Sequence, residues 1–415
     1  MEILQGFVDA VVGIFEDSGL LTLNWQNYVM IGISIVLLYL AIKKQYEPLL
    51  LLPIAFGMLL VNLYPSIMAP PTTQLLTEAQ CTAQNVAVSG HAKTVIDGVT
   101  YIENPTYGGL LYYLYQGVKL GIYPPLIFLG IGCMTDFGPL ISNPKSLILG
   151  AAAQIGIFLT FTGAIFLGFT EAEAGAIGII GGADGPTAIY VTTKLAPHLL
   201  GSIAIAAYSY MALVPIVQPP VIKAVTTKKE RLIRMKYTAG DVTKTTKILF
   251  PIVVTIIAGI VAPKSVALVG FLMFGNLIRE CGVLNNLSET AQNSFANILT
   301  ILLGITVASQ MYYEDFVKPQ TLLILGLGLV AFIFDTIGGV VFAKFLNLFL
   351  PKEKKINPMI GAAGISAFPM SGRVVNQMGL KEDNQNFLLM QSISVNVSGQ
   401  VASVIAGGLI LTLVS

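Results

Sequence analysis

The chain has little charge, and this shortage excludes whole classes of protein. Only 11% of its 415 residues are charged, and the formal net charge is +1. The mean hydropathy is +0.77, well above that of a soluble domain with a wet surface. There is no basic patch that could follow a phosphate backbone, so we expect no nucleic-acid partner. The composition predicts an integral membrane protein.

Cysteine and histidine are also scarce. The three cysteines, Cys81, Cys133 and Cys281, lie far apart with no C-x-x-C pair, which indicates neither a disulfide framework nor a zinc site. With only His91 and His198, the chain offers no metal cluster and no Ser-His-Asp arrangement. No Gly-Lys pair occurs, so a phosphate-binding loop is excluded. The energy for any transport must therefore come from a gradient or a partner.

Long apolar runs are abundant. A membrane-spanning helix needs about 20 largely apolar residues. Stretches that approach this length are residues 28–42, 49–64, 121–135, 147–168, 198–217, 247–262, 266–278, 295–310, 321–345 and 387–413. They predict an all-α polytopic membrane protein with about ten transmembrane helices. Residues 1–27 are acidic at the start and lack the features of a signal peptide, so we expect an amphipathic interfacial segment there.

Two further apolar segments are interrupted. Residues 175–195 and 356–378 contain Gly-Gly, Ala-Asp-Gly-Pro, Asn-Pro, Phe-Pro and Ser-Gly. Non-helical backbone at membrane depth persists only where protein or a cavity surrounds it. We therefore interpret both segments as broken helices or re-entrant hairpins.

The two halves of the chain resemble each other. "LGIG" at Leu129 is followed by "MTDF", a Pro-Lys turn and "SLILGAAAQIGIFL", whereas "LGIT" at Leu303 is followed by "YEDF", a Lys-Pro turn and "TLLILGLGLVAFIF". If the broken segments are re-entrant, each half makes an odd number of crossings and the halves have opposite orientation. The pattern predicts inverted structural repeats, residues 28–218 and 248–415, joined by a basic cytoplasmic linker, residues 219–247.

Lysine and arginine support one topology. Short cytoplasmic loops collect these residues, and nearly all the basic loops fall on one side when the crossings alternate. This topology brings the two broken segments in from opposite sides, with their tips able to meet near the midplane. Residues 65–106 then form an extracytoplasmic loop, with a small hairpin predicted around Asp97-Gly98.

Asp184, in "GIIGGADGPTAIY", is the strongest candidate for a functional residue. An ionised aspartate at the bilayer centre costs about 2.5–3.5 kcal/mol, so it persists where it faces a cavity, a cation or a proton. The glycines allow backbone carbonyls to turn towards a ligand, and Pro186 can start a half-helix. The alternative is that Asp184 caps a helix at a wet loop.

The second broken segment offers further polar residues, which are Asn357, Ser366, Ser371 and Arg373. A shift by the repeat length sets Ser366 opposite Asp184. Three roles are open for Arg373: it holds Asp184, it receives an anionic substrate, or it marks the cytoplasmic end of the segment.

Polar residues also follow each broken segment. Tyr208 and Tyr210 lie near the middle of the first helix that follows, and Asn396 shares a face of the second with Ser392 at i, i+4 spacing. Small polar residues also join membrane helices to each other, which is the alternative for any single serine here. Asp335 is a further intramembrane carboxylate without a broken-helix frame, and we interpret it as a packing or accessory group.

Four segments together carry a family resemblance. They are "GIIGGADGPTAIYVTTKLAP", "IAIAAYSYMALVPIVQPPVIKAVT", "LIRECGVLNNLS" and "INPMIGAAGISAFPMSGRVVNQMG". From about residue 28 to its end, the chain resembles the beta subunit of the sodium-pumping, biotin-dependent decarboxylases that act on oxaloacetate, methylmalonyl-CoA or glutaconyl-CoA. The resemblance implies a subunit that decarboxylates carboxybiotin, consumes a proton and exports sodium.

The resemblance also implies roles for individual residues. The implied residues linked to sodium and the proton are Asp184, Asn357, Ser366, Asn396, Tyr208 and Tyr210, of which Asp184, Asn357, Ser366 and Asn396 are the implied Na⁺ ligands. Arg373 and Asp184 are the residues implied for carboxybiotin binding and catalysis.

Partners are implied as well. The resemblance implies a carboxyltransferase alpha subunit, a biotin carrier subunit that supplies carboxybiotin, a small gamma/delta membrane subunit, membrane lipid and a trimer in a bacterial-type inner membrane. No Ala-Met-Lys-Met biotin acceptor occurs in this chain. Two other functions stay open from composition and topology: a sodium-coupled secondary transporter of an organic anion, and a passive anchor for other subunits.

Overall fold

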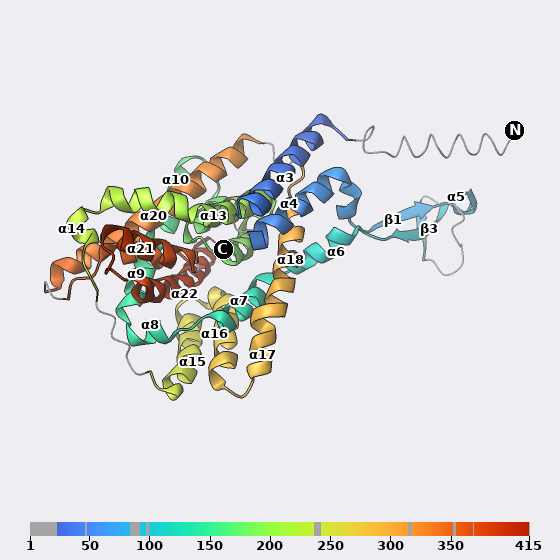
Figure 1. Cartoon of the computed structure of the whole chain (residues 1–415). Helices are drawn as coiled ribbons and strands as arrows, with labels where there is room; N and C mark the ends of the chain where they lie inside the picture. The colour runs from blue at the N-terminus through green and yellow to red at the C-terminus, as the bar shows by residue number, and fades with distance from the viewer. Residues whose placement is uncertain are drawn as a thin grey trace.

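The computed structural model is predominantly α-helical (Figure 1). It describes residues 23–45, 48–83, 92–96, 99–235, 242–313, 318–351, 354–367 and 369–414. The predicted interfacial segment, residues 1–27, lies almost wholly outside these residues.

Every predicted apolar stretch overlaps a helix. The helices of the first half are α3 (Trp25–Lys43), α4 (Pro48–Leu63), α6 (Leu110–Lys119), α7 (Tyr123–Met134), α8 (Gly138–Ser142), α9 (Lys145–Ala153), α10 (Ile155–Phe166) and α13 (Leu200–Val225). A four-residue helix, α14 (Lys228–Arg231), lies in the linker. The second half has α15 (Lys244–Val261), α16 (Val266–Cys281), α17 (Asn285–Thr290), a π-helical turn η5 (Ala291–Phe295), α18 (Ala296–Ala308), α20 (Pro319–Phe349) and α22 (Leu389–Val414).

Among the described residues, 6 helices are long and apolar enough to cross a membrane, or up to 8 if each bent pair is one span. The bent pairs are α6 with α7, at 68°, and the two parts of α13, at 67°. The chain is therefore a multi-pass, all-α membrane protein. The figure of about ten crossings, from the length rule, stays a prediction.

Both interrupted segments are broken in the structure. The first consists of α11 (Glu171–Gly178), η2 (Ile179–Gly182) and α12 (Gly185–Leu195), and the second of η7 (Pro358–Gly364) and α21 (Met370–Glu382). A capping box at Thr170 and Glu173 starts α11. Pro186 lies in the first turn of α12, where its missing N–H costs no hydrogen bond.

A small antiparallel sheet lies in the predicted extracytoplasmic loop. Its strands are β1 (Thr72–Leu76), β2 (Lys93–Ile96) and β3 (Val99–Thr106) in the order β1-β3-β2, accompanied by the short helix α5 (Glu78–Ala83). Ile96 pairs with Val99, so the strands of the predicted hairpin are confirmed, whereas Asp97 and Gly98 lie outside the described residues. In Figure 1 the sheet lies apart from the helices.

The helices pack into two bundles. The first bundle contains α3, α4, α6, α7 and α15–α18, and the second contains α9–α13, η2, η7 and α20–α22. In each bundle the two halves of the chain interleave: α4 packs on α18 and α16 on α7, while α9 packs on α22 and α20 on α13. Neither half therefore forms a compact unit by itself.

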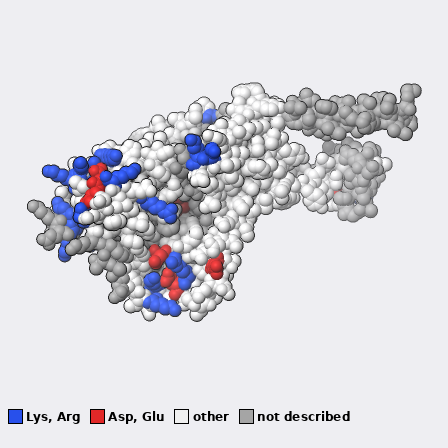
Figure 2. Space-filling view, viewed as in Figure 1, with Lys and Arg blue, Asp and Glu red and all other residues white. Residues whose placement is uncertain are grey.

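Charged side chains gather at the ends of the helices. Figure 2 shows Lys and Arg mainly over the end where α14 lies and over the ends of α15 and α16. Near the ends of α15 and α16, Lys247 Nζ lies 3.8 Å from Asp136 Oδ1 and 3.7 Å from Glu280 Oε2. This distribution is typical of a membrane protein whose loops carry the charge.

Glycines allow the closest crossing of the first bundle, between α7 and α16. A Cβ at Gly132 would lie 2.0 Å from the Leu272 carbonyl oxygen, and a Cβ at Gly275 would lie 2.0 Å from that of Leu129. Neither contact involves a flexible side chain that could move away. The two backbones touch because each helix places a glycine at the crossing.

Gly132→Ala should therefore destabilise the protein by about 1–3 kcal/mol, the usual cost of overpacking. Gly163→Ala is the matched control, because a Cβ there has nothing within 4 Å. Thermal unfolding of both variants in the same detergent measures the difference. Equal midpoints would contradict a close α7–α16 crossing.

Candidate functional site

Asp184 lies at the break between η2 and α12. The preceding residue, Ala183, is left-handed with φ +50 and ψ 42, a conformation that costs an L-residue roughly 1–2 kcal/mol. Asp184 itself is extended and is the N-cap of α12, where its Oδ1 accepts a hydrogen bond of 3.2 Å from the Thr187 N–H. The carboxylate is 5% exposed. Asp184 is thus a helix cap as well as a buried acid, not a cap at a wet loop.

The tips of the two broken segments meet at this carboxylate. The Ser366 N–H donates to the Gly182 carbonyl oxygen at 2.9 Å, and the Ser366 hydroxyl donates to Asp184 Oδ2 at 3.3 Å. A second hydroxyl, that of Ser403 on α22, donates to the same oxygen at 2.9 Å. The structure therefore brings together the aspartate and serine that the repeat set opposite each other.

A cavity of ≈ 120 Å³ opens beside the tips. Its polar lining comes from Asp184, Ser366 and Gln400, and its apolar wall includes Phe128 and Met134 of α7. The cavity thus lies where the second bundle faces the first. One water needs roughly 10–15 Å³ of such volume, so the cavity has room for a small ion with part of its hydration shell.

Several oxygen atoms in or beside the cavity could bind a cation. Gln400 Oε1, in the cavity lining, and Thr187 Oγ1, on the residue whose N–H donates to Asp184, are buried and have no hydrogen-bond partner among the described residues. Together with the Asp184 carboxylate and the serine hydroxyls they make a donor set of oxygen atoms only, which suits a hard cation. Across the described part of the chain, no three His, Cys, Asp or Glu residues gather as a transition metal would need.

Asn396 lies next to the second tip. Its side-chain amide donates to the carbonyl oxygens of Ala363 at 3.0 Å and Ile365 at 2.7 Å, and to the Ser371 hydroxyl at 3.0 Å. Its Oδ1 is buried and without a partner among the described residues. Asn396 therefore fixes the backbone just before Ser366 and still has an oxygen to offer.

Asn357 is in a different place. Its side-chain amide donates to the carbonyl oxygens of Arg231 and Ile233, both at 2.9 Å, and its Oδ1 accepts from the Met359 N–H at 3.1 Å. These partners belong to the linker and to η7, not to the tip at Asp184. In this conformation Asn357 holds the linker against the start of the second broken segment.

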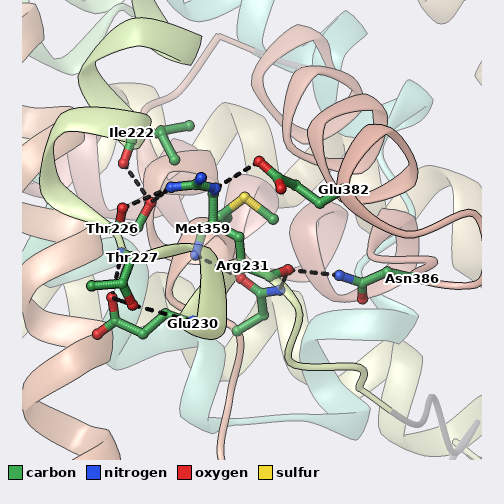
Figure 3. Close-up of polar contacts among 9 residues, drawn as sticks. Ile222, Thr226, Thr227, Glu230, Arg231, Met359, Glu382 and Asn386 are labelled. Carbon is green, nitrogen blue, oxygen red and sulfur yellow. Dashed lines mark hydrogen bonds and ion pairs between the residues drawn. The ribbon is translucent and has the colours of Figure 1, made fainter.

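The linker is fastened at several further points, which Figure 3 shows around Arg231. Arg231 Nε donates to Glu382 Oε1 at 2.7 Å, while its carbonyl oxygen accepts from the Asn386 side chain at 2.9 Å. Arg234 pairs with Asp383 at 2.6 Å. Both ends of the second broken segment are thereby tied to the linker. We call residues 226–235 with these contacts the linker clamp.

The two tyrosines separate in the structure. Tyr208 lies against the first tip, since a Cβ at Gly185 would lie 2.1 Å from its ring. Tyr210 donates instead to the Leu325 carbonyl oxygen and joins α13 to α20. Of the two tyrosines, Tyr208 is therefore the one that lies against the residue after Asp184.

Arg373 is exposed on α21. Among the described residues it forms no ion pair with Asp184, whose side-chain oxygens accept from Ser366, Ser403 and Thr187. The option that Arg373 holds Asp184 is therefore not realised here. An exposed guanidinium remains able to meet an anion.

Two site residues were not found by sequence reasoning. Ser403 lies seven residues after Asn396 on α22, so its helical spacing could have placed it on that face. Gln154 lies between α9 and α10, where its amide donates to the Gly364 carbonyl oxygen at 2.9 Å. A Cβ at Gly182 would lie 3.3 Å from its Oε1, so Gln154 touches both broken segments. No local sequence signal marks it.

Comparisons with known proteins agree on one family. The family described as the Na⁺-transporting oxaloacetate decarboxylase beta subunit matches residues 26–414. The methylmalonyl-CoA decarboxylase subunit beta of Propionigenium modestum is 52% identical over 408 residues, 98% of this chain and 99% of that protein. The glutaconyl-CoA decarboxylase subunit beta of Acidaminococcus fermentans is 46% identical over 411 residues, 99% of each chain. The oxaloacetate decarboxylase beta chain of Klebsiella pneumoniae is 45% identical over 430 residues, 97% of this chain and 99% of that protein.

Ser403→Ala should weaken cation binding at Asp184. The variant loses a hydrogen bond to a charged group, worth about 1.5–3 kcal/mol, so we expect an affinity lower by roughly tenfold or more. Ser398→Ala, on the same helix, loses only a bond to the Leu147 carbonyl oxygen and should bind as the wild type does. Sodium-dependent protection against thermal unfolding measures both. A normal affinity in Ser403→Ala would exclude the hydroxyl from the site.

The linker clamp should loosen in acid. Burial raises the pKa of Glu230, but hydrogen bonds from Thr227 and Lys344 outweigh it and leave the pKa below its ordinary value of 4.5. A hydrogen bond from Arg234 lowers the pKa of Asp383 below 3.8. Lowered carboxyl pKa values stabilise the folded state above those ordinary values, and the stabilisation is lost as pH falls through the lowered pKa values.

Hydrogen exchange of residues 226–235, corrected for the intrinsic rate, should therefore be slow at neutral pH and should accelerate once the pH falls below 4.5, the ordinary pKa of Glu230. A peptide covering residues 123–134 of α7, which has no carboxyl group, is the internal control. Unchanged protection of the linker at the acid end would show that these pairs do not hold it.

Proposed function

The chain belongs to the family of Na⁺-transporting oxaloacetate decarboxylase beta subunits, and on that premise we propose that it is the membrane subunit of a sodium pump that decarboxylates carboxybiotin and exports sodium. The observation that carries the proposal is the meeting of two broken helices at Asp184. There the Asp184 carboxylate, the Ser366 hydroxyl and the unpaired Gln400 amide oxygen line a small cavity, and the Ser403 hydroxyl bonds the same carboxylate. This donor set suits Na⁺.

Asp184 can carry sodium and a proton in turn. A bound Na⁺ stabilises the carboxylate charge, and protonation removes that charge, so one site alternates between two occupants. The Ser366 and Ser403 hydroxyls lie within 3.3 Å and 2.9 Å of the same oxygen. Because hydroxyls both donate and accept, they can donate to the bare carboxylate or turn their oxygen towards a cation.

The proton has a place in the reaction. Decarboxylation breaks the N–C bond of carboxybiotin, releases CO₂ and leaves the bonding electron pair on the ureido nitrogen, which takes up one proton from water. Arg373 is exposed in the first turn of α21, and its guanidinium can pair with the carboxylate of carboxybiotin. Moving one sodium ion against 100 mV costs about 2.3 kcal/mol, so the chemical step and the export step must be coupled.

We further propose that the two halves are inverted repeats. The interleaved packing supports this. If each helix is replaced by its counterpart in the other half, the contact of α4 with α18 becomes that of α16 with α7, and the contact of α9 with α22 becomes that of α20 with α13. The same exchange relates α20 on η2 to α9 on η7. A two-fold axis in the membrane plane would give these reciprocal contacts.

The chain needs partners. We propose that a carboxyltransferase alpha subunit and a biotin carrier bring carboxybiotin to the linker side, that a small gamma/delta membrane subunit completes the complex, and that the chain forms a trimer in a bacterial inner membrane. The relatives support a multisubunit enzyme, since each is named as a subunit or chain of a decarboxylase.

The decisive experiment measures sodium and carboxyl loss together. In proteoliposomes that contain the full chain, adding carboxybiotin should drive sodium across the membrane with matching release of CO₂. Sodium movement without CO₂ release would instead support a secondary transporter, and no movement at all would support a passive anchor.

Asp184→Asn should abolish sodium transport and sodium-dependent protection, because a neutral amide cannot balance the cation. Membrane insertion should be unchanged. Asp136→Asn, at an exposed carboxylate beside Lys247, is the matched control and should stay active. Full activity of Asp184→Asn would exclude Asp184 as the ion site.

A further inference from the structure

A second carboxylate is buried in the membrane core, and the proposed mechanism does not use it. Asp335 lies near the middle of α20, which runs from Pro319 to Phe349 and is the longest described helix. Its side chain is 0% exposed. An acid at this depth is rare unless it faces a partner, a cavity or a proton.

Two glycines from the first half make room for this carboxylate. A Cβ at Gly156, in the first turn of α10, would lie 2.5 Å from Asp335 Oδ1. A Cβ at Gly181, in η2, would lie 2.6 Å from Asp335 Oδ2. Any other residue at either position would displace the carboxyl group. The acid therefore has a fitted place between α10 and the first broken segment.

That place contains no partner for a charge. Both oxygens of Asp335 lack a hydrogen-bond partner among the described residues. The backbone N–H groups of Gly156 and Ile157 point towards the carboxyl group but do not reach hydrogen-bonding geometry. Across the described ranges, no Lys, Arg or His forms an ion pair with it.

The elements packed on α20 explain this isolation. They are α9, α10, α11, α13, η2 and η7. Their titratable or charged side chains are Lys145, Glu171, Glu173, Tyr208, Tyr210 and Lys223, and Asp184 follows η2. Lys145, Glu171 and Lys223 are exposed, and Glu173 bonds His198. The Tyr208 ring lies against Gly185, Tyr210 bonds the Leu325 carbonyl oxygen, and Asp184 accepts from the two serines.

A bare carboxylate in such surroundings is too costly to persist, and buried groups of this kind neutralise instead. A sodium ion would need several oxygen ligands, but the structure brings the first turn of α10 and Gly181 of η2 against Asp335. The positive end of α10 disfavours a cation there. A proton needs no ligand shell, and a buried acid without a counter-charge or a completed hydrogen bond is favoured in its protonated form.

We propose that Asp335 is a second proton-binding site of this protein, which holds a proton while η2 lies against it and exchanges that proton when η2 moves away. On release the O–H bond breaks, the proton passes to water, and the carboxylate left behind faces the N-terminus of α10, which favours an anion. This inference concerns Asp335 by itself and does not depend on which ion Asp184 carries.

The position of Asp335 connects it to both broken segments. Four residues further along α20, a Cβ at Gly339 would lie 2.1 Å from the Gly361 carbonyl oxygen of η7. One face of α20 thus touches η2 at Asp335 and η7 at Gly339. Gln154 Oε1, also without a partner among the described residues, lies beside Gly182, the next residue of η2 after Gly181. A change in the charge of Asp335 would therefore act on both broken segments.

Infrared difference spectroscopy of the full chain in lipid nanodiscs tests the protonation. At pH 7 the C=O stretch of a protonated carboxylic acid should be present in the wild type and in Asp136→Asn, and the part due to Asp335 should be missing from Asp335→Asn. A spectrum of Asp335→Asn identical to that of the wild type in this region would show that Asp335 is ionised and would overturn the proposal.

Sodium provides a second arm of the test. In an Asp184→Asn background, adding sodium should leave the Asp335 band in place. Loss of the band on addition of sodium would make Asp335 a sodium ligand and would also overturn the proposal. This arm measures the infrared band of Asp335 and not transport, so its result is independent of the proposed pump.

Hydrogen exchange tests the link to η2. In an Asp184→Asn background, which removes the other acid of this segment, exchange at residues 179–185, corrected for the intrinsic rate, should rise with pH as Asp335 loses its proton. When Asp335→Asn, whose amide resembles the neutral acid, is added to that background, the corrected exchange should not change with pH. A merely structural role predicts the same pH profile in both proteins. If Asp335→Asn does not fold, Asp335→Glu serves, and its profile should retain the dependence on pH.

Discussion

The structure depends on one constraint: backbone N–H and C=O groups that leave a helix inside a membrane must find partners in the protein. Both broken segments create such groups. The Ser366 N–H finds the Gly182 carbonyl oxygen, and the Asn396 side chain takes the carbonyl oxygens of Ala363 and Ile365. Each tip is therefore completed by the other tip or by α22. The contacts that satisfy the backbone are the same contacts that bring Ser366 to Asp184.

The two buried carboxylates differ because their surroundings differ. Asp184 borders a cavity and accepts hydrogen bonds from two hydroxyls and a backbone N–H, an environment in which a charge or a cation can be stabilised. Asp335 lies tightly between Gly156 and Gly181, and its oxygens have no hydrogen-bond partner among the described residues. The first suits ion exchange and the second suits a proton. Both contact the first broken segment, so its movement can affect both.

The contacts of Asn357 with the linker indicate a structural role for this residue. A residue in a Gly/Pro-rich membrane segment is naturally interpreted as a ligand, but its amide donates to the carbonyl oxygens of Arg231 and Ile233. The same linker pairs with Glu382 and Asp383 at the far end of the segment. Replacing Asn357 would therefore first disturb the contacts between the linker and the start of the second broken segment.

By itself, the sequence determined the helical class, the apolar helices, the two breaks and the place of Asp184 at the first break, because hydrophobic runs, Gly/Pro pairs and an isolated acid are local signals. It also set Ser366 opposite Asp184 through the repeat. Only the tertiary structure decided that Ser403 and Gln154 join the site, that Tyr208 and Tyr210 separate, and that Gly156 and Gly181 enclose Asp335. The physical reason is distance along the chain. Ser403 is 219 residues from Asp184, and no local sequence pattern predicts which side chains meet when two interleaved halves pack.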